Sequence, residues 1–198
     1  MSISKIIIGL TLSLLVGSSV AIAADFGRGL EAKNSGDFKT ALAEWIPLAE
    51  QDNAMAQFNL GHMYANGYGV PENDKTAVKW YTLAAEQGYA MAQYQLGIMY
   101  ANGRGVPEND KTAVKWYTLA AVQGYAMAQR YLGAMYDFGD GVPENDKTAV
   151  KWYNLASYNG NKNAGENKNK IAKQMTPADI SKAQDISSAC LASNYMDC

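Results

Sequence analysis

The sequence contains a single histidine, His62, and two cysteines, Cys190 and Cys198, among its 198 residues. Any Ser-His-Asp or Cys-His catalytic arrangement, and any histidine-based metal site, would therefore depend on one imidazole. The positions that correspond to His62 in the repeats described below hold Ile98 and Ala134. This favours an ordinary residue on a helix surface, and we expect no catalytic role for it.

Charged residues are also scarce, at 18% of the chain, and the formal net charge is −2. A nucleic-acid-binding domain needs clustered Lys and Arg, so that class of partner is excluded. Motifs for nucleophilic catalysis or phosphate binding are missing as well, since Ser-x-x-Lys occurs only from Ser2 to Lys5. Carboxylates such as Glu72 and Asp74 lack the spacing of a calcium loop and suit the start of a helix instead. The sequence predicts no metal site and no cofactor.

A long hydrophobic run occurs only near the N-terminus, from residue 6 to residue 20. Lys5 precedes it and Ala21-Ile22-Ala23 follows, which is the pattern of a bacterial signal peptide cleaved after Ala23. An uncleaved anchor is the alternative, but the run is shorter than the ~20 residues that a membrane span needs. We therefore expect a periplasmic or secreted protein that has no membrane segment after cleavage.

One string of thirteen residues, Gly-Val-Pro-Glu-Asn-Asp-Lys-Thr-Ala-Val-Lys-Trp-Tyr, occurs three times without a change. Its copies span residues 69–81, 105–117 and 141–153, so they lie 36 residues apart. A fixed period of this length is typical of a solenoid, in which each unit buries its apolar face against its neighbours.

Each unit contains the patterns of two helices. From an N-cap at Asn73, apolar residues recur on one arc at helical spacing until Gly88, which suits the left-handed position after a helix end. A second helix is predicted from about Ala90 to Asn102, and Gly97 lies where a neighbouring helix could approach closely. The sequence therefore predicts an all-α solenoid of helix-turn-helix repeats.

The expected boundaries follow from this register. Glu44 occupies the position of Trp80 in the first unit, as a terminal repeat with a wetter outer face would require. Residues 159–170 are rich in Asn, Lys and Gly, and Lys168 replaces a core Leu, so this stretch is either a disordered linker or a slipped, polar helix. Thr176-Pro177 begins a final helix that reaches about Ser193 and caps the open end. The predicted segments are a signal peptide at 1–23, a half-repeat helix at 24–36, repeats at 37–72, 73–108 and 109–144, a degenerate repeat at 145–175, and a capping helix with a cysteine-containing tail at 176–198.

The repeated residues resemble the Sel1-like repeat family, which is related to the tetratricopeptide repeats. The residues that carry the resemblance are Ala77, Trp80, Tyr81, Ala84, Ala85, Glu86, Gln87, Gly88, Ala90, Ala92, Gln93, Leu96, Gly97, Met99, Tyr100, Gly103, Gly105 and Val106. The resemblance implies a right-handed superhelix whose first helices line a concave face, and a role as an adaptor that binds other proteins.

The resemblance suggests two hypotheses for the function of the protein. The leading hypothesis is a non-enzymatic scaffold that binds a protein or peptide on its concave helical face. The alternative is a cell-wall-associated or β-lactam-binding hydrolase, by analogy with a cysteine-rich branch of the family. That branch carries a disulfide within each repeat, whereas no repeat of this chain contains a cysteine.

The candidate binding residues lie at constant repeat spacing on the first helix of each unit. They are Lys79, Leu83, Lys115, Leu119, Lys151 and Leu155. If the leucines are exposed, they form an apolar ladder flanked by lysines, as a peptide-binding groove requires. If they lie at the edge of the packed arc, each one packs on the second helix of its own unit.

Cys190 and Cys198 are predicted to form a disulfide, because paired cysteines in an exported protein are usually oxidised. On one continuous helix they would be ~12 Å apart, which is too far to bridge. The chain must therefore turn back near Ser193-Asn194-Tyr195, where Asn194 suits the residue after a helix end.

Overall fold

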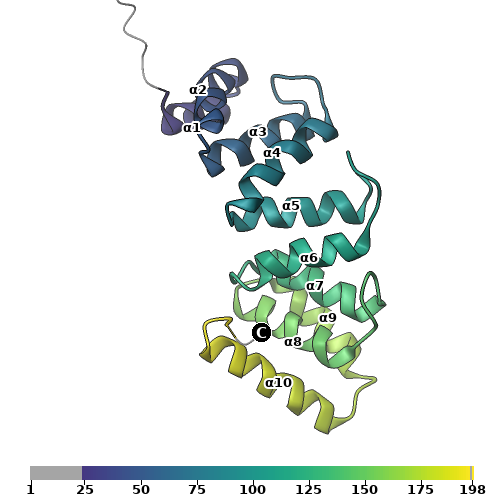
Figure 1. Ribbon diagram of the computed structural model, residues 1–198. Coiled ribbons are helices and arrows are strands. Elements are labelled where there is room, and N and C mark those ends of the chain that lie inside the picture. The colour runs from purple at the N-terminus through teal and green to yellow at the C-terminus, as the bar shows by residue number, and fades with distance from the viewer. Residues whose placement is uncertain (1–23, 197) are drawn as a thin grey trace, which may run out of the picture.

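The computed structural model describes residues 24–196 and residue 198, and every regular element in these residues is an α-helix. The helices stack in a curved column that runs from α1 and α2 at one end to α10 at the other (Figure 1). The predicted signal peptide, 1–23, lies outside the described residues. The helices are α1 (Phe26–Ser35), α2 (Phe38–Glu50), α3 (Ala54–Asn66), α4 (Asp74–Glu86), α5 (Ala90–Ala101), α6 (Asp110–Ala121), α7 (Ala126–Phe138), α8 (Asp146–Tyr158), α9 (Lys162–Ala172) and α10 (Pro177–Ala192).

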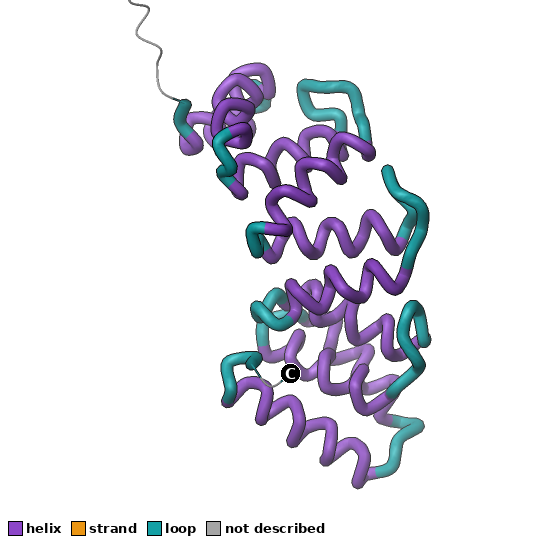
Figure 2. Tube along the Cα trace, viewed as in Figure 1, coloured by secondary structure: helices purple, strands orange, loops and turns teal. Residues whose placement is uncertain are grey.

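The ends of each repeat unit are set by the residues that the sequence indicated. The Asn73 side chain accepts a hydrogen bond from the backbone N–H of Thr76 at 2.9 Å, which caps the start of α4. Gly88 follows the end of α4 with a φ of +87°, a conformation that costs glycine little. Asn109 and Asn145 cap α6 and α8 in the same way. The all-α solenoid is confirmed, and short loops connect its helices at the two edges of the column (Figure 2).

Close packing between units depends on one glycine in each second helix. The most extensive contacts join the second helix of one unit to the first helix of the next, in the pairs α3 and α4, α5 and α6, and α7 and α8. At Gly133 of α7, a Cβ atom would lie 2.8 Å from the ring of Tyr153 on α8. Gly97 faces Tyr117 in the same way, which confirms the close approach predicted at this position. The buried tyrosine rings therefore fill the space that glycine leaves.

The N-terminal end corrects the interpretation of Glu44. Its side chain is only 13% exposed, because α1 covers it. Arg28 of α1 forms an ion pair with the Glu44 carboxylate at 2.7 Å, and the backbone N–H of Asp25 donates to the same carboxylate at 2.8 Å. Glu44 is therefore the anchor for the first helix, and its position is not a wetter outer face.

Residues 159–170 form neither a linker nor a slipped helix. Asn161 caps α9, which keeps the register of the earlier second helices. Ala164 and Ile171 are buried at the positions that correspond to Ala128 and Met135. Ala164 and Ile171 are the buried residues of α9, and most of its remaining residues are polar.

The C-terminal helix packs along α8. Asp179 pairs with Lys147, Ala183 lies in the apolar cluster of α8 and α9, and Ser187 accepts a hydrogen bond from Asn154. After α10 the chain reverses through Asn194 and Tyr195, which both have positive φ. Cys190 and Cys198 are joined by a disulfide with a Cα–Cα distance of 5.0 Å, as the sequence predicted.

Candidate protein-binding surface

The three leucines of the predicted ladder have two different environments. Leu83 on α4 and Leu119 on α6 are 41% and 46% exposed, so both present a large part of their side chain to solvent. Leu155 on α8 is fully buried, in a cluster that includes Cys190. The burial of Leu155 thus involves the C-terminal residues, which neither alternative for the ladder included. The exposed part of the ladder therefore consists of Leu83 and Leu119.

A tryptophan precedes each of these leucines on the same face. Trp80 and Trp116 are half-buried, and each packs against the apolar cluster of the preceding unit. Beside Trp80, a hollow of about 410 Å³ is lined by residues of α4 together with Tyr64 of α3. Its remaining lining residues are Thr76, Lys79 and Leu83. In this unit the hollow is therefore lined mainly by apolar and aromatic side chains, with Lys79 among its lining residues.

The three lysines divide in the same way as the leucines. Lys79 and Lys115 are exposed, whereas Lys151 is only 7% exposed. The Lys151 ammonium donates a hydrogen bond to the main-chain oxygen of Cys198 at 2.9 Å and lies 4.1 Å from the ring centroid of Trp152. Burial lowers the pKa of Lys151 to about 8. The environment of the lysine thus depends on the cover that the C-terminal residues provide.

Tyr195 completes this cover. Its hydroxyl accepts a hydrogen bond from the Asn159 side-chain amide at the end of α8. Its ring lies on Gly124, where a Cβ atom would be 3.3 Å from the ring. At Gly88, the corresponding position one unit earlier, a Cβ atom would meet no atom within 4 Å.

A row of buried amides runs beside this surface, and sequence reasoning missed its role. Gln57, Gln93 and Gln129 each donate to a carbonyl at the end of their own first helix, namely Ala49, Ala85 and Ala121 respectively. Each also accepts a hydrogen bond from the next unit, through Gln87, Gln123 and Asn159. The sequence signal for this role is Gln93, a polar residue that follows Ala92 inside an apolar stretch and recurs in each repeat. A buried amide at such a position needs hydrogen-bond partners.

His62 lies away from this surface. Its ring is 5.7 Å from that of Tyr68, and its Nδ1 is buried without a hydrogen-bond partner in the described structure. Burial, with Lys33 nearby, lowers the pKa of His62 and keeps the imidazole neutral at pH 7. Since no carboxylate orients it, His62 lacks the arrangement of a general base.

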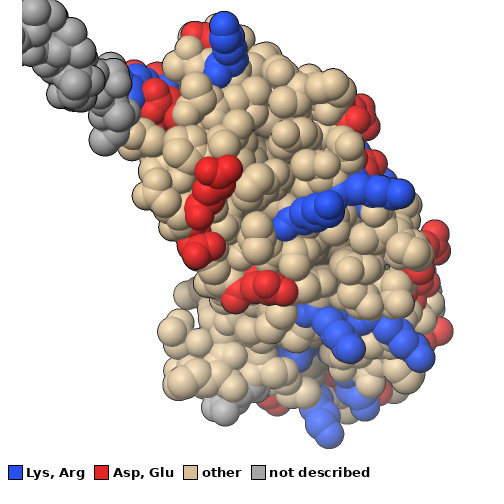
Figure 3. All heavy atoms as spheres, turned by 45° about the horizontal axis from the view of Figure 1, so that its top comes forward, with Lys and Arg blue, Asp and Glu red and all other residues tan. Residues whose placement is uncertain are grey.

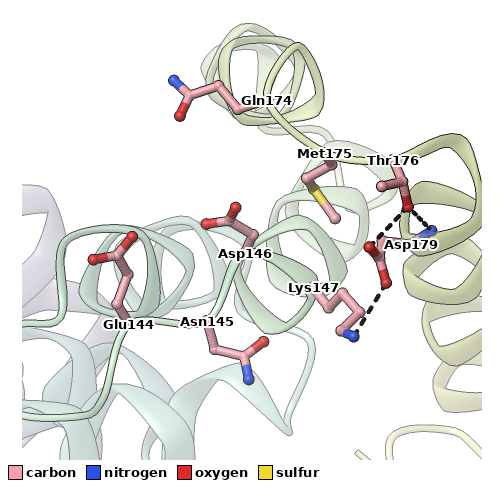
Figure 4. Close-up of a pocket in the computed structure, with 8 residues that line it drawn as sticks. All are labelled: Glu144, Asn145, Asp146, Lys147, Gln174, Met175, Thr176 and Asp179. Atoms are coloured by element: carbon pink, nitrogen blue, oxygen red, sulfur yellow. Dashed lines mark hydrogen bonds and ion pairs between the residues drawn. The ribbon is translucent and has the colours of Figure 1, made fainter.

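A second hollow, of about 420 Å³, opens between the start of α8 and the start of α10 (Figure 4). Lys147 and Asp179 point towards each other across it at 3.1 Å, and Thr176 donates to the same carboxylate. Glu144 and Asp146 line the other side. In the described residues no group of three or more His, Cys, Asp or Glu side chains could hold a metal ion. This hollow lies where the C-terminal helix α10 meets the last repeat, at the start of α8.

One face of the molecule can be followed in space-filling form (Figure 3). Figure 3 shows one face on which neutral residues dominate and basic side chains gather over the lower part. Among the residues that the structure describes, none of the helices combines the length and apolar character needed to cross a membrane.

Comparison with known proteins agrees with this architecture. A family model described as Sel1 repeat matches residues 54–89, 90–125 and 126–161, which together make up more than half of the chain. The chain belongs to the Sel1 repeat family. The family model divides the same 36-residue period at another point, from the second helix of one predicted repeat through the first helix of the next.

Solved structures of Sel1 repeat proteins are similar to this chain. The Sel1 repeat protein from Oxalobacter formigenes shares 35% identity with a TM-score of 0.70, over 73% of this chain and 59% of that protein. The protective antigen c5321 of uropathogenic Escherichia coli, which has an SLR fold, shares 27% identity with a TM-score of 0.53, over 86% of this chain and 46% of its own length.

Cysteine rich protein B of Helicobacter pylori shares the fold at 23% identity and a TM-score of 0.53, over 66% of this chain and 93% of that protein. A comparison with curated proteins found no match. The chain thus spans less than two thirds of the first two structural relatives and most of the third.

Proposed function

We propose that this Sel1 repeat protein is a non-enzymatic scaffold that binds a protein partner on the face formed by α4 and α6. The observation that carries the proposal is the pair of exposed leucines, Leu83 and Leu119, one repeat apart and each beside a lysine. Soluble domains rarely expose aligned apolar residues without a partner for them. The half-buried Trp80 and Trp116 give this strip a fixed floor.

The test compares Leu83→Ser/Leu119→Ser with the unchanged protein in pull-downs from periplasmic extract. Phe138→Ser is the matched control, because Phe138 is 71% exposed and lies on a second helix, away from the strip. A partner retained by the unchanged protein and by Phe138→Ser, but lost by the double variant, supports the proposal. A partner that all three proteins retain equally would place binding elsewhere.

The proposal includes export to the periplasm or the medium. Its support is the N-terminal pattern of residues 1–23 together with the Cys190–Cys198 disulfide, which suits an oxidising compartment. Intact-mass measurement of the exported protein should show a product that begins at Ala24. A retained Met1 would contradict processing at this point.

The alternative hydrolase or β-lactam-binding function makes an opposite prediction. The described residues contain no activated nucleophile beside His62, and Ser-x-x-Lys lies within residues 1–23. We therefore expect neither nitrocefin turnover nor covalent labelling by a fluorescent penicillin. Either signal would replace the scaffold proposal.

A further inference from the structure

The C-terminal turn, described for residues 190–196 and 198, already occupies one copy of the proposed binding surface. Four groups of the array hold it: Lys151 donates to the main-chain oxygen of Cys198, Leu155 lies in one apolar cluster with Cys190, Asn159 donates to the Tyr195 hydroxyl, and Gly124 lies under the Tyr195 ring. We call these four residues the terminal site. The terminal site shows what kind of chain segment this surface accepts.

The same four positions recur one repeat earlier. Lys115, Leu119, Gln123 and Gly88 stand there, and we call them the open site. All four are exposed, and no atom lies within 4 Å of a Cβ built on Gly88. The one chemical difference is Gln for Asn, which keeps the side-chain amide; without a ligand, the second N–H of the Gln123 amide donates to the Leu119 carbonyl at 3.1 Å. The open site therefore has the groups of the terminal site without the segment that covers them.

A third copy is incomplete. Lys79, Leu83 and Gln87 match the first three positions, but the fourth holds Asp52 where the other copies have glycine. Asp52 has a φ of +61°, so its backbone resembles that of the glycines, but it carries the side chain that the glycines lack. The third copy can offer the lysine and the leucine, but it has no space for an aromatic side chain.

Building on the proposed function, we propose that the open site binds a tyrosine-bearing turn of a partner protein, with the chemistry of the C-terminal turn. The tyrosine ring lies on Gly88, and its hydroxyl replaces the Leu119 carbonyl as the acceptor of the second Gln123 N–H. A main-chain oxygen of the turn accepts a hydrogen bond from Lys115, and a small apolar side chain covers Leu119. Specificity comes from Gly88, since a side chain at that position would fill the ring's place.

The test uses a synthetic peptide of residues 190–198, closed by its own disulfide, titrated into the full chain by calorimetry. We expect one peptide per chain, because the terminal site is already filled and the third copy is blocked. A peptide in which Tyr195 is replaced by alanine should bind at least tenfold more weakly. A peptide of residues 177–192, which has the sequence of α10, tests for a helical ligand instead.

Protein variants locate the site. Lys115→Met/Leu119→Ser should weaken peptide binding at least tenfold, whereas Phe138→Ser, at an exposed position on a second helix, serves as the control and should leave it unchanged. Gly88→Asn should abolish binding without unfolding the chain, since Asn tolerates the left-handed conformation. Asp52→Gly should raise the stoichiometry from one peptide to two. Circular dichroism of each variant confirms its helical content.

The inference is overturned if the turn peptide does not bind at about 1 mM, which corresponds to only about 4 kcal/mol of binding free energy. It is also overturned if the peptide of residues 177–192 binds in its place, or if Lys115→Met/Leu119→Ser binds as well as the unchanged chain. The proposed function is tested independently of this result. If Leu83→Ser/Leu119→Ser loses a partner in the pull-down, the scaffold function is supported even if the turn peptide does not bind.

Discussion

Gln123 donates a hydrogen bond through Nε2 to Oε1 of Gln93 in the preceding second helix, at 2.7 Å. Gln93 in turn donates to the carbonyl of Ala85 at 3.1 Å, and its side chain is almost completely buried. The carbonyl at the end of one first helix is thus connected to the residue that follows the next first helix. This amide row fixes how far each unit is displaced from its neighbour.

The amide row predicts a measurable cost for Gln93→Ala. The substitution removes two hydrogen bonds, one to the Ala85 carbonyl, which keeps a backbone donor from Gly88, and one from the exposed Gln123. Each such bond contributes about 0.5–1.5 kcal/mol net, so we expect unfolding in urea at a lower midpoint, by about 1–3 kcal/mol of stability. Gln184→Ala, at an exposed position of α10, is the control and should change little. Equal losses of unfolding free energy in the two variants would show that the amide row makes no net contribution to stability.

The split leucine ladder predicts unequal costs for the same substitution. Leu155→Ala removes a fully buried side chain and should cost about 2–5 kcal/mol of unfolding free energy. Leu83→Ala and Leu119→Ala, at exposed positions, should stay within about 0.5 kcal/mol of the unchanged protein. Chemical denaturation measures all three. A comparable loss at Leu119 would mean that its exposed face is packed in solution and would remove it from the binding surface.

The disulfide predicts local destabilisation. Cys190→Ser/Cys198→Ser opens a small loop, which lowers stability by about 2–3 kcal/mol in the chain-entropy model. Because contacts in a solenoid join only neighbouring units, we expect faster hydrogen exchange in α8 and α10 with unchanged protection in α4 and α5. Loss of protection spread evenly over all helices would contradict this expectation. Native protein should also show no titratable thiol, since both cysteines are bonded.

Lys151 predicts a pH dependence of stability. Its pKa in the folded chain is about 8, below the ordinary value of 10.5, because burial disfavours the charged form. Between these values the unfolded state binds more protons, so stability rises with pH. The gain from pH 8 to pH 9 is on the order of 1 kcal/mol. At higher pH it is offset and then reversed, since burial raises the pKa of Tyr81, Tyr117 and Tyr153 and the unfolded tyrosines ionise first.

Denaturation midpoints of the unchanged protein and of Lys151→Met, measured from pH 7 to pH 9, test this dependence. The variant lacks the Lys151 ammonium and should show a flat profile up to pH 9. Lys115→Met is the control, because Lys115 is exposed. A rise that persists in Lys151→Met would assign the effect to another group.

The repeat period, the helix bounds and the disulfide could be predicted from the sequence because each depends on local signals. Asn73 and Gly88 mark helix ends through their own backbone and side-chain chemistry. The burial of Leu155 could not be predicted in this way, because the cover comes from residues that lie more than thirty positions away in the chain. Glu44 was misjudged for the same reason, since its partner Arg28 lies in another helix.

The amide row and the state of residues 159–170 show a second limit. In α9, Ala164 and Ile171 are the buried residues that keep the register of the earlier repeats. The many polar residues around them made the stretch resemble a linker or a slipped helix when only the sequence was considered. Gln93 belongs to the family pattern, but its two partners are known only once neighbouring helices are placed side by side.

The three identical strings have a consequence for how this architecture can change. The face of α8 that α10 covers is built from Lys147, Val150, Lys151 and Leu155, and α4 and α6 carry the same residues at the corresponding positions. A gene that gained or lost one 36-residue segment would still present this face at its last unit. The cap therefore fits an array of any length, and the molecule can lengthen by duplication without a new ending.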